Sequence, residues 1–274
     1  MSGAPDWLEE SARFLRELSE REGGTLYVPA GTPREHNPPT ARVAEAQPGL
    51  FADEGGVPWG GAPPRAGTDP VGIPPAMLEA VPEDAPGRGE LLDRFALQAA
   101  PCLKCALGET RCRFVFGSGR ADATLMFVGE APGAEEDAQG LPFVGAAGQL
   151  LTRIIESIGF ERADVYIANI LKCRPPGNRD PQAEEVAACE PYLHRQIALI
   201  RPRVICALGR IAGQVLLKTN ISLTRLRGQV HSYQGRPLVV TYHPAALLRN
   251  PNWKRPTWED MKMLRRIHDG AAGS

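Results

Sequence analysis

Short hydrophobic runs that alternate with longer amphipathic segments most limit how this chain can fold. Runs such as 124–128 and 238–242 have the length and composition of buried strands, and the segments between the runs have helical periodicity. Strands that alternate with helices form parallel sheets with both faces covered. The sequence therefore predicts an α/β, three-layer fold with a central, mainly parallel four-stranded sheet and helices on both faces. The expected strands are 124–128, 165–168, 203–207 and 238–242, and the expected helices are 147–158, 181–200, 210–217 and 257–268.

Polar side chains stand where these strands end. Glu130 lies in the turn GEAPG (129–133) after the first strand, Asn169 follows the second, and His243 with Pro244 follows the last. In open α/β folds, ligands bind at the carboxyl edge of the sheet. We therefore expect the three polar side chains to face one pocket, with His243 exposed. The helix that follows Pro181 is expected to be capped by the residue before that proline, Asp180.

The chain divides into three segments by composition. Residues 1–28 include an amphipathic pattern at 6–22, which predicts an N-terminal helix region. Residues 29–89 contain 13 prolines and no sustained periodicity, which predicts a disordered linker. That linker is either a plain spacer or an acidic tail that binds a partner or masks the chain's own surface. Residues 90–270 are expected to form the folded domain that carries the functional site, beginning with a short helix at 91–99.

The net charge of −1 conceals an uneven distribution of charge. Residues 1–90 hold 15 acidic and 7 basic side chains, whereas residues 191–258 hold 11 Arg or Lys and no Asp or Glu. A stretch of this kind favours a surface that faces a polyanion, although a solvated face is the simpler interpretation. No apolar run is long enough to span a membrane, and positions 1–20 lack the pattern of a signal peptide. We therefore expect a cytoplasmic protein that does not bind membranes.

The six cysteines are expected to bind metal rather than form disulfides, because the cytoplasm is reducing. Cys102 and Cys105 form a C-x2-C pair, and Cys173 and Cys189 complete a set of four thiolates. Such a set suits either tetrahedral zinc or a [4Fe–4S] cluster, and the spacing does not decide between them. Cys112 is a rival ligand. The sixth thiol, Cys206, lies in an apolar run and is expected to pack in the core.

Several segments, taken in order, give the chain from about residue 92 to 268 its resemblance to a known family. These segments are GEAPG (129–133), EED (135–137), LPFVG (141–145), GQLL (148–151), NILKCRPPGN (169–178) and HPAALLRN (243–250). With them, the chain resembles the family 4, iron–sulfur uracil-DNA glycosylases. The resemblance implies a [4Fe–4S] cluster on Cys102, Cys105, Cys173 and Cys189, removal of uracil from DNA in the repair of deaminated cytosine, and a monomer whose partner is uracil-containing DNA.

The resemblance also suggests how the pocket residues act. Phe143 would stack on the uracil ring, with Gly129 beside the base, or would be a plain core residue. Asn169 would pair with N3–H and O4 of uracil, a pattern that cytosine reverses, or would only cap its strand. His243 would donate a hydrogen bond to the charge that develops on O2. Leu247 would fill the gap left by the flipped base, or would be an ordinary packed leucine.

Two departures from the better-known family 1 enzymes leave roles open. Ala131 stands where family 1 has the Asp that positions water, and Glu130 is our first candidate for that task. Gly133 stands where family 1 has a Tyr that excludes the methyl group of thymine, and Glu136 is our candidate for that exclusion. Both glutamates also have a purely structural interpretation.

The main rival hypothesis is a zinc-bearing DNA-binding protein without catalysis. It predicts a colourless protein and no abasic product. An enzyme that acts on nucleotides or phosphate esters is less consistent with the sequence, because the chain has neither a P-loop nor a dinucleotide-binding fingerprint.

Overall fold

The computed structural model describes residues 74–270. The predicted N-terminal helix region 1–28 and residues 29–73 of the predicted linker lie outside the described residues. In the described part, no helix is both long enough and apolar enough to cross a membrane.

The domain is built around one sheet of six strands in the order β1-β3-β2-β4-β6-β5. The four inner strands, β3, β2, β4 and β6, pair in parallel, and the two edge strands pair antiparallel to their neighbours. The four predicted strands are these four inner strands, so the mainly parallel α/β architecture is confirmed. The strands are β1 Ser118–Gly119, β2 Leu125–Gly129, β3 Tyr166–Asn169, β4 Val204–Leu208, β5 Val230–Tyr233 and β6 Arg236–Thr241.

The expected number of four strands was too low, because both edge strands lack a hydrophobic run. Strand β1 has only two residues, the second of which is Gly119 with a φ of 131°, and it follows Gly117, whose φ is 146°. Strand β5 is largely exposed and forms a hairpin with β6 through Gln234 and Gly235, both with positive φ. Edge strands of this kind are polar and short, so hydrophobic patterning does not reveal them.

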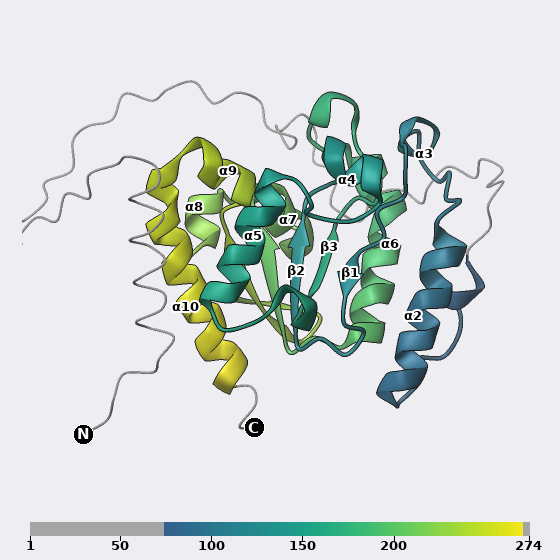
Figure 1. The fold of residues 1–274 in the computed structure, drawn as a ribbon, viewed down its shortest axis with the longest axis horizontal. Helices are drawn as coiled ribbons and strands as arrows, with labels where there is room; N and C mark the ends of the chain where they lie inside the picture. The colour runs from purple at the N-terminus through teal and green to yellow at the C-terminus, as the bar shows by residue number, and fades with distance from the viewer. Residues whose placement is uncertain (1–73, 271–274) are drawn as a thin grey trace, which may run out of the picture. The chain divides into compact units, whose positions relative to one another are not determined.

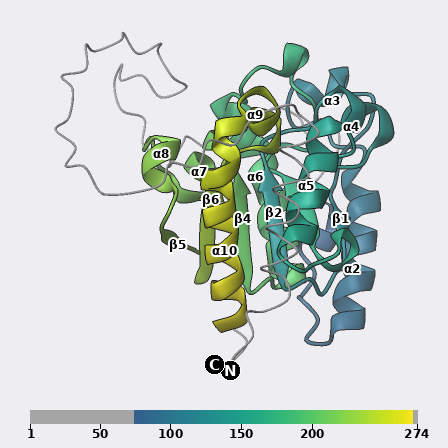
Figure 2. The same cartoon turned by 60° about the vertical axis from the view of Figure 1, so that its left-hand side comes forward.

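Helices cover both faces of the sheet (Figure 1 and Figure 2). One core cluster joins a sheet face to α2, α6 and α7, and the other joins the opposite face to α5 and α10. The three-layer prediction is therefore confirmed. The helices are α2 Ala85–Ala99, α3 Leu107–Thr110, α4 Ala134–Gln139, α5 Ala146–Ser157, α6 Ala183–Ile200, α7 Arg210–Leu217, α8 Leu223–Leu226, α9 Pro244–Arg249 and α10 Lys254–Gly270, and the 3-10 turns are η1 Pro75–Met77, η2 Arg162–Asp164, η3 Pro176–Asn178 and η4 Pro251–Trp253.

Residues before the expected domain boundary at 90 also belong to the folded body. Helix α2 begins at Ala85, after Asp84 accepts a hydrogen bond from the Gly87 amide at 2.7 Å. Further upstream, the carbonyl of Ala76 accepts from Arg195 Nε at 2.9 Å. The boundary predicted from composition therefore falls inside a helix, because prolines and glycines here form a capped helix start rather than a linker.

The start of α6 also differs from the expectation. Gln182 is the N-cap, and its amide donates a hydrogen bond to Glu185 Oε2 at 2.8 Å. Asp180 is therefore not the cap, because the capping box two residues later satisfies the first amides of the helix. Asp180 instead accepts a hydrogen bond from Arg210 at 2.6 Å.

Candidate active site

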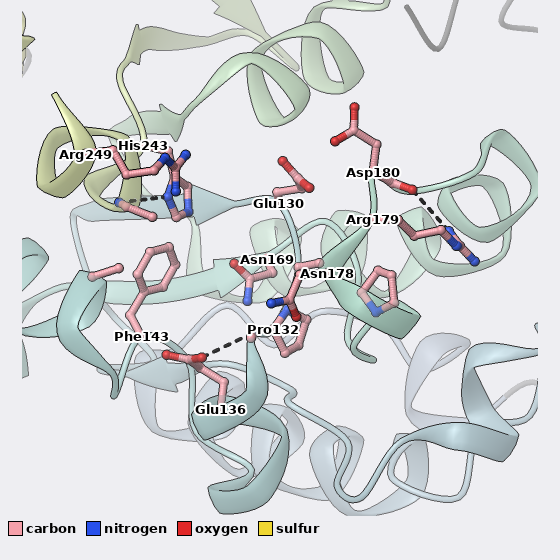
Figure 3. Close-up of a pocket in the computed structure, with 15 residues that line it drawn as sticks. Glu130, Pro132, Glu136, Phe143, Asn169, Asn178, Arg179, Asp180, His243 and Arg249 are labelled. Carbon is pink, nitrogen blue, oxygen red and sulfur yellow. Dashed lines mark hydrogen bonds between the residues drawn. The ribbon is translucent and has the colours of Figure 1, made fainter.

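A cavity of about 390 Å³ opens at the carboxyl ends of β2, β3 and β6. It brings together Glu130, Asn169 and His243, which are far apart in the sequence. Figure 3 shows Asn169 in the middle of the lining, with Phe143 and His243 on one side and Asp180 on the other. The three polar side chains that were expected at one edge of the sheet lie there together.

Asn169 ends β3 and is 1% exposed. Among the described residues, its side-chain oxygen Oδ1 has no hydrogen-bond partner. A buried carbonyl without a partner is costly, by about 1–3 kcal/mol, so such an atom marks a place where a ligand supplies the missing donor. Asn169 lines the cavity, and its unpartnered oxygen lies beside Gly129 at the end of β2.

Gly129 is paired with Asn169 in the β2–β3 register and has no room for a side chain. A Cβ atom at this position would meet Asn169 Oδ1, and it would lie 2.6 Å from the ring atom Cζ of Phe143. The glycine thus allows the amide and the ring to approach the same strand end.

Phe143 has a φ of 53°, a left-handed conformation that costs a non-glycine residue about 1–2 kcal/mol. Its ring lies 5.4 Å from the His243 ring, centroid to centroid. Two side chains hold the flanking backbone: Arg162 donates to the carbonyl of Pro142 at 2.7 Å, and Glu136 accepts from the amide of Val144 at 2.9 Å. The strained backbone is therefore held from both sides.

Glu136 lines the cavity but uses its carboxylate on the main chain. Oε1 also accepts from the Gly145 amide at 3.1 Å, and Oε2 accepts from the Gly133 amide at 3.1 Å. From the sequence, Glu136 was expected to exclude thymine. Its hydrogen bonds give it a second role, which the sequence did not predict. The carboxylate fastens the turn after β2 to the loop that carries Phe143.

His243 is the N-cap of α9, and its Nδ1 accepts a hydrogen bond from the Ala245 amide at 3.2 Å. Burial, together with a smaller contribution from the charge of Arg249, lowers the pKa of His243 to about 4, although the charge of Glu136 opposes the shift. The imidazole is thus neutral near pH 7, and its proton sits on Nε2 because Nδ1 is an acceptor. The side chain is half-buried rather than exposed as expected, because Phe143 packs near it.

Glu130 follows β2 and is half-buried. Burial, together with a smaller contribution from the charge of Asp180, raises its pKa to about 7, although the charge of Arg210 opposes the shift. A carboxyl group with a pKa near neutrality can accept a proton at physiological pH, which suits a general base.

Comparison with known proteins identifies the family that this site belongs to. A model of the uracil-DNA glycosylase superfamily matches residues 116–262. Type-4 uracil-DNA glycosylases of Sulfurisphaera tokodaii and Archaeoglobus fulgidus are each 45% identical to this chain, over 64% of it and over 84% and 92% of those proteins. The chain belongs to the type-4 uracil-DNA glycosylases. A type-5 enzyme of Pyrobaculum aerophilum is 35% identical, over 54% of this chain and 72% of that protein.

Leu247, expected to fill the gap left by a flipped base, is buried in this glycosylase domain. It is 1% exposed, whereas its neighbour Leu248 on α9 is 45% exposed. A wedge must be exposed before DNA binds, so the position predicted by matching the wider superfamily is not the one that the surface offers. The periodicity of α9 could have shown this, since adjacent residues point to different sides of a helix.

Four other polar residues that line the cavity were not predicted from the sequence: Asn178, Arg179, Asp180 and Arg249. The first three lie in the loop between β3 and α6, and the fourth ends α9. The motif segments 169–178 and 243–250 contain or adjoin all four. Their position next to predicted strand ends was the available signal.

The four predicted metal-binding cysteines lie close enough to affect one another electrostatically. Burial is the main cause that raises the pKa of Cys173 to about 11 and of Cys189 to about 12, and Cys105 adds to both shifts. Cys102 likewise acts on Cys105 and Cys173. A thiol that is hard to ionise alone is stabilised as a thiolate by a bound metal.

Two donors point at sulfur atoms in this group of four thiols. Arg111 Nη1 lies 3.5 Å from Cys173 Sγ, and the Lys172 amide donates to Cys189 Sγ at 3.3 Å. Hydrogen bonds of this kind accompany metal-bound thiolates. No three His, Cys, Asp or Glu side chains within 74–270 are arranged to hold a metal ion, so the fit rests on the type and convergence of the four thiols.

The two remaining cysteines separate from this group. Cys112 is exposed, and its amide donates to Asp137 Oδ1 at 3.0 Å. Cys206 is fully buried in β4, where it packs in the core as expected. All six cysteines lie in the described region, and none forms a disulfide.

Proposed function

We propose that this protein excises uracil from DNA by hydrolysing the N-glycosidic bond, after the nucleotide has flipped into the cavity at the carboxyl edge of the sheet. Membership of the type-4 uracil-DNA glycosylases supports this reaction. The single observation that carries the site assignment is the buried, unpartnered Oδ1 of Asn169 in a cavity that also contains Phe143 and His243.

Asn169 selects the base. Its Oδ1 accepts from N3–H of uracil and its Nδ2 donates to O4, so the acceptor without a partner gains a donor when the base binds. Cytosine presents an acceptor at N3 and a donor at N4, which leaves both amide atoms facing like groups at about 1–3 kcal/mol each. Phe143, held by its backbone, supplies the stacking surface.

His243 stabilises the leaving base. When the C1′–N1 bond breaks, its electron pair stays on uracil, and negative charge develops on O2 while the sugar becomes cationic. The neutral imidazole donates its Nε2 proton as a hydrogen bond to O2, which is stabilisation of the oxyanion type. Because the pKa of His243 is about 4, the imidazole is neutral near pH 7 and carries no positive charge that would bind other anions.

Glu130 completes the hydrolysis. Water attacks C1′ and forms the new C–O bond, and Glu130 takes the proton that the water loses. A pKa of about 7 means that a substantial fraction of this carboxyl is ionised near neutral pH. Glu136 limits the space beside C5 of the base by fixing the loop 141–145, which gives it a part in excluding thymine.

Leu248 and Arg249 serve the flipping step. Leu248 is the exposed leucine next to the cavity and fills the gap in the base stack, in place of the buried Leu247. Arg249 lines the cavity mouth and is exposed, which suits a phosphate contact. Such contacts offset the few kcal/mol that base flipping costs.

The cofactor that fits the four thiols is a [4Fe–4S] cluster on Cys102, Cys105, Cys173 and Cys189. When bound, such a cluster would supply a covalent cross-link between the segment that joins α2 to α3, the loop after β3 and helix α6, rather than a redox step. The test is visible absorption and iron content of protein purified without oxygen. A colourless protein that contains zinc would overturn the cluster assignment.

The activity is tested with oligonucleotides that contain a single uracil or a single thymine. After incubation with the protein, alkali-labile sites are expected at uracil only. Binding of the DNA without any abasic product would instead favour a non-catalytic DNA-binding protein.

A further inference from the structure

Lys172 is a charged side chain buried where the base pocket and the thiols meet. It is 0% exposed, and its ammonium Nζ donates to the backbone carbonyl of Asn169 at 2.8 Å and to Gln196 Oε1 at 2.6 Å. A fully buried lysine is rare, and both of its acceptors are neutral. The pairing charge that such a group needs must therefore come from elsewhere.

The four thiols are the available source of that charge. Lys172 lies next to Cys173 in the chain, and its amide donates to Cys189 Sγ at 3.3 Å. Since the Lys172 main chain contacts Cys189 Sγ and continues into Cys173, thiolates at these two cysteines would place negative charge close to this lysine. When the thiols lose their protons on binding a metal or cluster, their negative charge would lie next to Lys172.

Lys172 also contacts Asn169, the residue that is proposed to read the base. The segment from Asn169 to Cys173 has the unpartnered amide at one end and a thiol at the other. Its first amides donate to the motif after β2: Ile170 to the carbonyl of Gly129 at 2.9 Å, and Leu171 to that of Glu130 at 3.0 Å. A shift of this short segment would therefore move the pocket as well as the thiols.

Gln196 fixes the position of the ammonium. Its Nε2 donates to the carbonyl of Phe116 at 2.8 Å and contacts the Tyr166 hydroxyl at 3.3 Å. The lysine is thus held by a satisfied network that reaches into the sheet, and its placement is set by hydrogen bonds rather than by chance packing.

We propose that Lys172 is a positioning residue that ties the backbone of Asn169 to the thiolate site, so that the bound group there sets the position of the base-reading amide. This proposal rests on the proposed function, because it assumes that Asn169 reads the base and that the four thiols bind a cluster. It gives the cluster a part in base selection without any electron transfer.

The first experiment compares Lys172→Met with Tyr166→Phe in full-length, iron-loaded protein. Lys172→Met keeps the length of the side chain and removes its donors and charge, whereas Tyr166→Phe removes one hydrogen bond from the same network and leaves Lys172 in place. We expect Lys172→Met to lower the single-turnover rate of uracil release, per bound cluster, at least about tenfold, since displacement of a positioning group by about 1 Å can cost about a hundredfold. The KM for DNA should change little, and Tyr166→Phe should stay within about twofold of the wild type.

The second experiment needs no variant, so it decides the matter if Lys172→Met fails to fold. Hydrogen exchange of the peptide that spans 166–173 is measured in wild-type protein before and after a chelator removes iron. Faster exchange at Ile170 and Leu171 after iron removal supports the tie, and unchanged exchange overturns it.

Asn169→Ala distinguishes a failure of the proposed function from a failure of the proposal about Lys172. If Asn169→Ala releases uracil normally, the proposed base reader is wrong. If Asn169→Ala is inactive while iron-loaded Lys172→Met works at the wild-type rate and loses iron no faster, only the proposal about Lys172 is wrong.

Discussion

The base pocket and the thiol site lie at two ends of one short segment, yet the chain prepares them differently. In the pocket, protein groups alone fix the geometry: Glu136 holds three backbone amides, and His243 already has its tautomer set. In the thiol site, buried sulfurs have raised pKa values and need a bound group to ionise. The groups that recognise the base are thus preformed, whereas the thiol site that supports them depends on a bound group.

The largest effect is expected in the prepared pocket. His243→Ala should lower uracil release about 100- to 1000-fold, because it removes the donor to the developing charge on O2. Iron content and thermal midpoint should stay at wild-type values. The matched control is His194→Ala on α6, which contacts Glu190 outside the cavity and should keep full activity. Normal release by His243→Ala would remove this residue from the mechanism.

Asn169→Asp tests whether the pocket reads the base through one amide. The substitution replaces the donor that faces O4 by an acceptor, so uracil should lose and cytosine should gain about 1–3 kcal/mol of binding. The measurement is the ratio of release from uracil- and cytosine-containing oligonucleotides. An unchanged ratio would show that another group selects the base.

Cys173→Ser tests the site that depends on its occupant. It should lower iron content and the thermal midpoint, by roughly 5 °C or more, because a domain of this size shifts roughly 2–4 °C per kcal/mol. Cys112→Ser is the matched control, since that thiol is exposed and outside the group of four. Equal iron content and midpoints in the two variants would contradict the ligand assignment.

Glu136→Gln should have a smaller effect, because the amide keeps one acceptor for the loop. We expect a loss of about 1–2 kcal/mol, measured as an increase in KM together with a lower midpoint. A change in thymine release without any change in midpoint would instead indicate direct contact with the base.

The pH dependence gives the smallest expected change near neutrality. Glu130 must lose its proton to act as a base, so the rate should rise with pH through its pKa of about 7 and level off above it. His243 should not limit the rate between pH 5 and 8, because its pKa is about 4. Glu130→Gln should abolish the slope, and a slope that survives in that variant would assign it to another group.

The same shifts predict how stability varies with acidity. The pKa of His243 is lower in the folded than in the unfolded protein, so its neutral form favours folding above pH 6.5, and that contribution is lost as pH falls toward about 4. The pKa of Glu130 is raised by folding, so its contribution is present below pH 4.5 and is lost as pH rises through about 7.

Hydrophobic runs made the inner strands and the covering helices predictable, since burial on both faces leaves a strong pattern. The convergence of Glu130, Asn169 and His243 followed from a general property of parallel sheets. The polar edge strands, the backbone of Phe143 and the loop held by Glu136 did not follow, because each depends on contacts between distant parts of the chain. Lys172 is the clearest case: nothing around it in sequence shows that it is buried.

The left-handed backbone at Phe143 has a consequence for the range of substrates. The main chain sets the direction of the Phe143 ring, and Arg162 and Glu136 hold that main chain through hydrogen bonds. The ring therefore does not move aside for a larger base. We therefore expect the cavity to exclude purines by their size, before they contact Asn169 or His243.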